Sequence, residues 1–133
     1  KAKHRIANTL NILEKDPVYL ISTIINVHGE TMSYHDIYVS FNLFPTLSDN
    51  FKVGNDVDLW GYFRSQGYSI RRGVERIEAK LADEMISNKL KVAEGFPILY
   101  KERTLFSEDG TALALQYCNN RGDLYSLTIS LSR

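Results

Sequence analysis

This chain of 133 residues has only one cysteine and a formal net charge of zero. Cys118 is the single cysteine, so the chain can form no internal disulfide, and a reducing, cytoplasmic location is expected. Sixteen basic residues balance sixteen acidic ones, whereas a domain that grips DNA by itself is usually basic. No apolar run approaches the length of a membrane helix. Direct binding to nucleic acid or membrane is therefore not expected.

Catalytic and metal-binding motifs are also missing from the sequence. The three histidines, His4, His28 and His35, form no ligand pair at helical spacing. There is no glycine-rich phosphate loop and no Gly-x-Ser-x-Gly elbow. We therefore expect no metal, no cofactor and no enzyme activity, with Cys118 as a structural thiol. The length fits one domain, residues 1–133, and the missing initiator methionine indicates a piece of a longer protein.

An internal repeat is the strongest pattern present. A shift of the chain by 80 positions gives six identities between residues 2 and 17, where chance gives roughly one. The identical pairs are Ala2 and Ala82, Ile6 and Ile86, Asn8 and Asn88, Leu10 and Leu90, Glu14 and Glu94, and Pro17 and Pro97. One inserted residue later, Gly29 meets Gly110. Each half therefore predicts the same unit, which is a helix, a strand, a glycine turn and a second strand.

The coarse secondary structure follows from this unit and from apolar spacing. Strands are expected over 18–27, 31–40, 97–106 and 111–119, with hairpin turns at Gly29 and at Asp109-Gly110. Between the halves, 58–66 indicates a helix that ends at Gly67, and 70–82 a long strand. The alternation of Tyr125, Leu127, Ile129 and Leu131 predicts a final strand. We expect a two-layer α+β domain, in which an antiparallel sheet of about six strands carries helices on one side and has two pseudo-symmetric halves.

Several short sequence motifs follow one another along the chain in an order and spacing that can be compared with known families. They are Ile77-Glu78-Ala79 before Leu81-Ala82-Asp83-Glu84, Glu102-Arg103 before Gly110, Arg121-Gly122-Asp123 before Tyr125, and, in the first half, Gly29-Glu30, Tyr38 and Phe44-Pro45. In this order and spacing the chain resembles the UTRA domain, the effector-binding domain of bacterial transcription regulators of the GntR family, HutC subfamily. The resemblance implies the chorismate lyase-like fold. It also implies a separate winged-helix DNA-binding domain, absent from this chain.

The resemblance further implies a small-molecule effector and a homodimer, because such regulators read two operator half-sites. Phosphorylated sugars, phosphonates and carboxylates are the effector classes considered. Arg71-Arg72, Arg76-Ile77 and Asp36 are similar to the phosphonate-utilisation regulators. Sugar-phosphate sensors of the family often carry other side chains at positions that here are Thr23, Ile25, His35, Asp58, Trp60 and Ala114, so their pocket is not expected here.

The candidate ligand-binding residues fall into two groups. Arg71, Arg72 and Arg103 offer the planar donor forks that suit phosphate or carboxylate. If no bulge intervenes, strand alternation puts Arg71 on the core-facing side with Glu75. The alternative for Arg71 is a structural ion pair. The second group is polar and aromatic, and is expected to form pocket walls, or else a solvated sheet face: Tyr34, Asp36, Tyr38, Tyr117 and Asn119.

Three functions remain open at this point. The first is a ligand-sensing module that controls DNA binding. The second is a small lyase on the same fold, and the third is a pure dimerisation domain. The repeat, together with the Ile-Glu-Ala and Leu-Ala-Asp-Glu pattern, favours the sensor. Fold alone does not separate a sensor from an enzyme.

Overall fold

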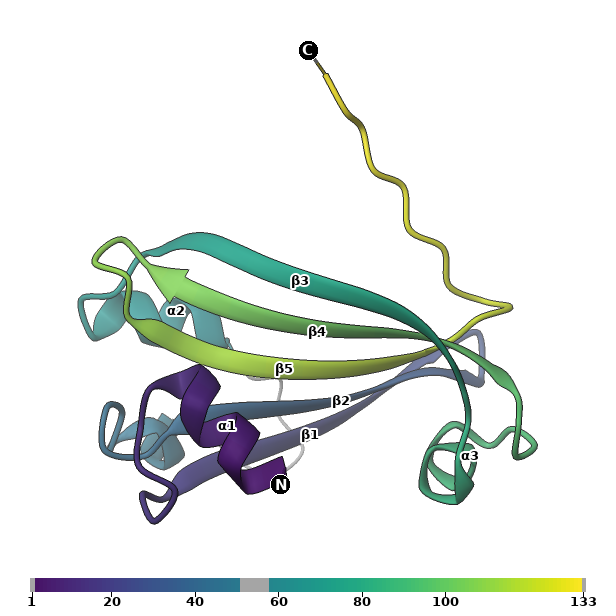
Figure 1. Ribbon diagram of the computed structural model, residues 1–133, viewed down its shortest axis with the longest axis horizontal. Helices are drawn as coiled ribbons and strands as arrows, with labels where there is room; N and C mark the ends of the chain where they lie inside the picture. Colours follow the sequence, from purple (N-terminus) through teal and green to yellow (C-terminus); the bar gives the residue numbers. More distant parts are fainter. Residues whose placement is uncertain (1, 51–57, 133) are drawn as a thin grey trace.

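The computed structural model describes residues 2–50 and 58–132, and Figure 1 shows how their elements are arranged. Two helix–hairpin units flank a central helix and a long strand. In chain order the elements are α1 (Ala2–Leu10), β1 (Val18–Val27), β2 (Glu30–Ser40), a 3₁₀ turn (Leu47–Asn50), α2 (Leu59–Ser65), β3 (Ile70–Leu81), α3 (Glu84–Leu90), β4 (Pro97–Ser107) and β5 (Ala112–Arg121). Asp83 caps α3, because its carboxylate accepts a hydrogen bond from the Ile86 amide at 2.9 Å.

All strand pairs in the sheet are antiparallel, in the order β1-β2-β5-β4-β3. The two hairpins close at Gly29 (φ 80°) and Gly110 (φ 86°), where a side chain would be strained. Joining the hairpins is the β2–β5 pair in the middle of the sheet. The α+β class and the antiparallel sheet are thereby confirmed, with five strands among the described residues.

The two halves repeat each other in detail. Both α1 and α3 end at a residue in the left-handed conformation, Asn11 (φ 56°) and Lys91 (φ 58°), and these residues are 80 positions apart. In the hairpins the repeat places Asp36 on Tyr117, and these two residues are directly paired between β2 and β5. The pseudo-twofold axis therefore passes through the Asp36–Tyr117 pair at the centre of the sheet.

Helices lie on both faces of the sheet, so the expectation that they share one side is wrong. On one face, α1 packs through Ile6 and Leu10 against Leu115, and α3 packs through Ile86 and Leu90. On the opposite face, α2 packs against Val39, Leu105 and Ala114 (Figure 1). We name these the α1/α3 face and the α2 face. The repeat does not predict the second layer, because α2 lies in the segment between the repeats and has no equivalent in either half.

The expected final strand is also wrong. Residues 125–132 are extended but join no strand, and Figure 1 shows them leaving the sheet beyond β3. At the root, a turn sets their direction: the Gly122 amide donates to the Pro97 carbonyl and the Tyr125 amide to the Arg121 carbonyl. Alternating apolar and polar side chains indicate an amphipathic segment, whereas a strand also needs the backbone of a neighbouring strand to which it can hydrogen-bond. Within the described chain, this segment has none.

The core under α2 gives the first testable prediction. Phe44 is fully buried, and its ring centroid lies 4.8 Å from that of Phe63 and 5.4 Å from that of Tyr68. Phe44→Ala should lower the free energy of unfolding by about 3–5 kcal/mol, because it removes burial and leaves a cavity. Leu13→Ala, at a side chain that is 60% exposed, should change it by no more than about 0.5 kcal/mol. Urea unfolding followed by circular dichroism compares the two, and equal losses would contradict this placement of the core.

Candidate ligand-binding sites on the two faces of the sheet

A cavity of about 380 Å³ lies between α1 and α3, over the pseudo-twofold axis. Residues from both helices and from the three central strands line it: Arg5, Ile6, Tyr34, Asp36, Tyr38, Met85, Tyr100, Tyr117 and Asn119. The structure therefore brings together all five polar and aromatic residues that the sequence grouped, and pairs Tyr34 with Asn119 and Asp36 with Tyr117.

The tyrosines of this cavity pack mainly against one another. The Tyr117 ring meets Tyr38 edge-on at 5.8 Å and stacks on Tyr100 at 6.3 Å, both between centroids. Burial raises the pKa of Tyr100 and of Tyr117 above the usual value for tyrosine, so both hydroxyls stay protonated near neutral pH. Asp36, the acidic member, accepts a hydrogen bond from Ser22 Oγ at 2.6 Å. Four tyrosine rings, one carboxylate and the Asn119 amide therefore form the side of the cavity that the sheet provides.

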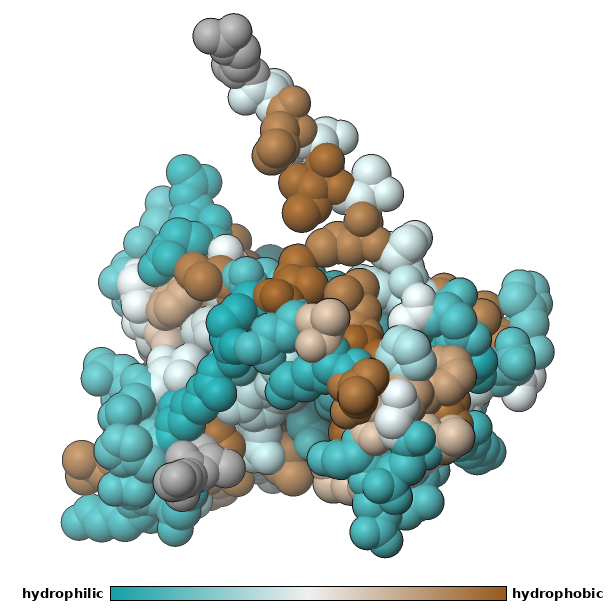
Figure 2. Space-filling view, turned by 45° about the vertical axis from the view of Figure 1, so that its right-hand side comes forward, coloured by the Kyte–Doolittle hydropathy of each residue, from teal (hydrophilic) through white to brown (hydrophobic). Residues whose placement is uncertain are grey.

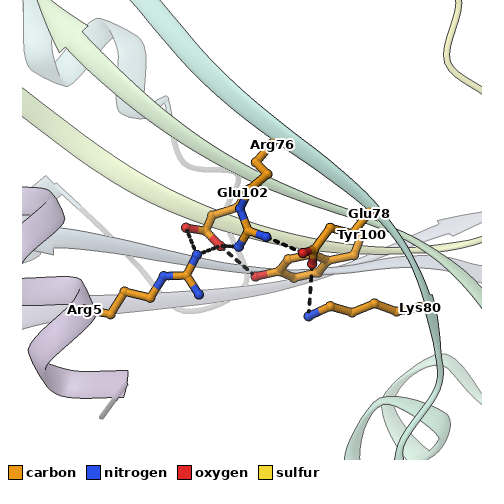
Figure 3. A network of polar contacts seen from close by, with 6 residues as sticks. All are labelled: Arg5, Arg76, Glu78, Lys80, Tyr100 and Glu102. Carbon is orange, nitrogen blue, oxygen red and sulfur yellow. Dashed lines mark hydrogen bonds and ion pairs between the residues drawn. The ribbon is translucent and has the colours of Figure 1, made fainter.

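Next to the cavity, Glu102 forms ion pairs with two arginines, Arg5 and Arg76 (Figure 3). The Glu102 side chain is only 10% exposed, and its carboxylate accepts two hydrogen bonds from Arg5 at 2.8 Å, which tie α1 to β4. Arg76 donates to the same group at 2.7 Å, and the Tyr100 hydroxyl at 3.3 Å. Arg76 also pairs with Glu78. On the α1/α3 face these two guanidinium groups are therefore already neutralised by carboxylates of the protein.

Arg71 and Arg72 do not line the aromatic cavity. The pairing of β3 with β4 is irregular between Ile70 and Arg72, which is the bulge that the alternation argument for Arg71 excluded. Both arginines are exposed, and the guanidinium carbon of Arg72 lies 4.2 Å above the Phe106 ring. The expectation of a core-facing Arg71 is wrong, because the bulge breaks the alternation on which it rests.

The α2 face carries a different chemistry, a row of polar side chains across β3, β4 and β5. Glu75 lies between two cations, with Arg103 Nε at 2.6 Å and Lys101 Nζ at 3.7 Å from its oxygens. Lys101 is buried, and its ammonium group also donates to the Tyr125 hydroxyl at 2.7 Å. One carboxylate thus serves two cations, which leaves an excess of positive charge along this row.

Two titratable groups next to this row respond to it. Burial lowers the pKa of His35, and the positive charges of Lys101 and Arg103 lower it further, so the imidazole is neutral near pH 7. Burial raises the pKa of Cys118 to about 11. The Cys118 thiol therefore stays protonated and is not an activated nucleophile, which agrees with a structural role.

A second cavity, of about 540 Å³, lies where α2 faces β3 and β4. Two arginines reach it from different elements, Arg64 from α2 and Arg103 from β4, and Trp60 and Gly73 contribute to its wall. Among the described residues that line it there is no carboxylate. Arg103 also belongs to the polar row, so the cavity and the row form one continuous positively charged region.

Of the candidate ligand-binding residues named from the sequence, Arg103 alone reaches this region. Sequence reasoning missed Arg64, Lys101 and Glu75 as its neighbours, and Arg5 and Glu102 on the other face. A signal was present, because Lys101, Glu102 and Arg103 are consecutive in one strand and must alternate between faces. Thr23 and His35, two of the positions where sugar-phosphate sensors carry other residues, are paired in β1 and β2 and also lie on the α2 face.

Among residues 2–50 and 58–132, no three His, Cys, Asp or Glu side chains are grouped so that they could hold a metal ion. In the same part of the chain, no helix has the length and apolar character needed to cross a membrane.

Solved structures that are similar to this chain include effector domains of bacterial regulators. The effector domain of PhnF from Mycobacterium smegmatis aligns with a TM-score of 0.87 at 20% identity, over 96% of this chain and 77% of that one. The C-terminal domain of the histidine utilization repressor from Pseudomonas syringae aligns with a TM-score of 0.79 at 19% identity, over 96% of this chain and 87% of that one. A GntR-family regulator from Enterococcus faecalis aligns with a TM-score of 0.79 at 15% identity, over 94% of this chain and 88% of that one. A second PhnF structure is matched over 55% of its length.

The family model of the UTRA domain matches residues 1–126. The chain therefore belongs to the UTRA domain family. The family and the fold expected from the sequence motifs are confirmed.

The Glu102 network gives the second prediction. Glu102→Gln should lower the free energy of unfolding by about 1–2 kcal/mol, because Arg5 and Arg76 lose their shared counter-charge while remaining about half exposed to water. Glu78→Gln is the matched control, and should cost less than about 1 kcal/mol, since Glu78 is itself 37% exposed. Chemical denaturation measures both variants. A Glu102→Gln protein as stable as wild type would show that this network does not hold α1.

Proposed function

We propose that this UTRA domain is the ligand-sensing part of a GntR-type transcription regulator and that it binds a small anion on the α2 face. The observation that carries the proposal is the pair Arg64 and Arg103, which line one cavity from opposite walls. Arginine is suited to the role because its donor fork matches the oxygens of phosphate, phosphonate or carboxylate.

The charge distribution supports the α2 face over the aromatic cavity. On the α2 face, Glu75 is shared by Lys101 and Arg103, so an anion would complete the neutralisation of the row. On the α1/α3 face, Arg5 and Arg76 are occupied by Glu102, and Asp36 would repel an anion. We therefore assign Tyr34, Asp36, Tyr38, Tyr117 and Asn119 to the support of α1 and α3, and Arg71 and Arg72 to the surface.

Regulation would follow from a homodimer that carries separate winged-helix DNA-binding domains. An effector that binds more tightly to one arrangement of those domains shifts the population towards it. The matched structures are described as regulators and effector domains, which supports sensing over catalysis. Phosphonates, phosphorylated sugars and carboxylates are the effector classes that fit two arginines and a buried lysine.

Isothermal titration tests the proposal with three probes, methylphosphonate, glucose 6-phosphate and citrate. The tightest-binding probe should bind Arg103→Gln and Arg64→Gln about 10- to 100-fold more weakly than wild type, because each variant removes a charge-assisted contact. Arg72→Gln, on the opposite face, is the matched control and should keep wild-type affinity. If Arg72→Gln weakens binding while Arg64→Gln and Arg103→Gln do not, the site is on the other face.

A further inference from the structure

The two carboxylates beside Tyr117 on the α1/α3 face have unequal partners. Tyr117 is paired with Asp36 of β2 on one side and with Glu102 of β4 on the other. Glu102 binds two arginines (Figure 3), whereas Asp36 accepts a hydrogen bond from Ser22 and forms no ion pair within the described residues. Among residues 2–50 and 58–132, the carboxylate that lines the cavity therefore lacks the cation that the neighbouring carboxylate has.

The internal repeat explains this difference. Arg5, the α1 residue that neutralises Glu102, stands 80 positions before Met85 in α3. By the same shift, Glu102 corresponds to Ser22, which is paired with Asp36. Both Arg5 and Met85 line the cavity, so α3 presents a thioether where α1 presents a guanidinium group. A thioether carries no charge, and the position from which the second half would neutralise Asp36 is left to a cation from outside the protein.

The tyrosine rings of the cavity are suited to the same charge. Four of them line it, and the electron-rich face of such a ring attracts cations. Lys80 Nζ lies 3.8 Å from the centroid of the Tyr100 ring. Lys89 Nζ lies 5.5 Å from that of the Tyr34 ring. Neither lysine lines the cavity, so the ring surfaces that do line it remain available to a further cation.

The size of the cavity and the surface around it suit a small, water-soluble molecule. Its volume of about 380 Å³ lies in the range of small-molecule sites in proteins. In Figure 2 hydrophilic residues (teal) predominate in the lower part of the molecule, where Figure 1 places α1 and α3. Ile6 and Met85 add apolar contacts at the helix side of the cavity. A cation that carries a short alkyl chain therefore matches the cavity in charge, size and apolar contact.

We infer that the cavity between α1 and α3 binds a small organic cation, an alkylguanidinium or alkylammonium compound, whose charged group pairs with Asp36. The ligand takes the place that an arginine side chain has in the other half of the repeat, and its alkyl chain lies against Met85 and the tyrosine rings. This role is additional to the support that the cavity residues give to α1 and α3. The inference goes beyond the proposed function, because the site lies on the opposite face of the sheet from the anion site and uses none of its residues.

Butylguanidine and butylurea are a matched pair of probes, because they have nearly the same shape and differ in charge. In isothermal titration of the 133-residue chain, butylguanidine should bind at least about 10-fold more tightly than butylurea, since only the cation gains the ion pair with Asp36. Asp36→Asn should weaken butylguanidine binding by about 10- to 100-fold and leave butylurea binding unchanged. The control is Glu84→Gln, which removes an exposed carboxylate of α3 that does not line the cavity and should keep wild-type affinity.

Met85→Arg tests the argument from the repeat. The new guanidinium group should pair with Asp36 and weaken butylguanidine binding at least about 10-fold. Anion binding on the α2 face should be the same in Asp36→Asn and Met85→Arg as in wild type, so the two proposals succeed or fail separately. The inference is overturned if butylguanidine does not bind at about 10 mM, if butylurea binds as tightly, or if either cavity variant keeps wild-type affinity for butylguanidine.

Discussion

The pairing of β2 with β5 is the contact on which the rest of the domain depends. It joins two helix–hairpin units that are each incomplete alone, because an isolated two-stranded hairpin is marginally stable in water. At its core, Ser33 Oγ donates to Asn120 Oδ1 at 2.6 Å, and Asn120 Nδ2 donates to the Leu99 carbonyl at 3.0 Å. Ser33 and Asn120 are each 1% exposed, so this polar contact fixes the register of three strands inside the protein.

Once that register is set, alternation along β4 decides which chemistry each face receives. Glu102 points to the α1/α3 face and binds Arg5 and Arg76, so that face uses its charges to hold a helix. Lys101 and Arg103 point to the α2 face and share Glu75, so that face keeps an excess of positive charge. Lys101 also contacts Tyr125, which connects the proposed anion site to the root of the projecting segment.

Much of the fold could be predicted from the sequence because it is encoded locally. The repeat, the hairpin glycines and the apolar spacing place the strands, and the repeat by itself makes Asp36 and Tyr117 equivalent positions. Two features resist such reasoning. The bulge at Arg71 has no marker in the residue types around it, and it leaves Arg71 exposed where alternation predicts a core-facing side chain. The direction of residues 125–132 is set by the turn after β5, and an alternating pattern does not contain that information. The ionic site was only partly predictable, since the partners Arg64, Glu75 and Arg103 come from three different elements.

We propose that the α2 face, and not the aromatic cavity, is the anion-binding surface of this UTRA domain. Chemical-shift mapping of the amides during titration with the tightest-binding anion tests it most directly. The largest shifts should fall on Arg64, Gly73 and Arg103, around the cavity beneath α2. Saturating shifts concentrated on Tyr34, Asp36 and Tyr117, with the α2 face unchanged, would contradict it.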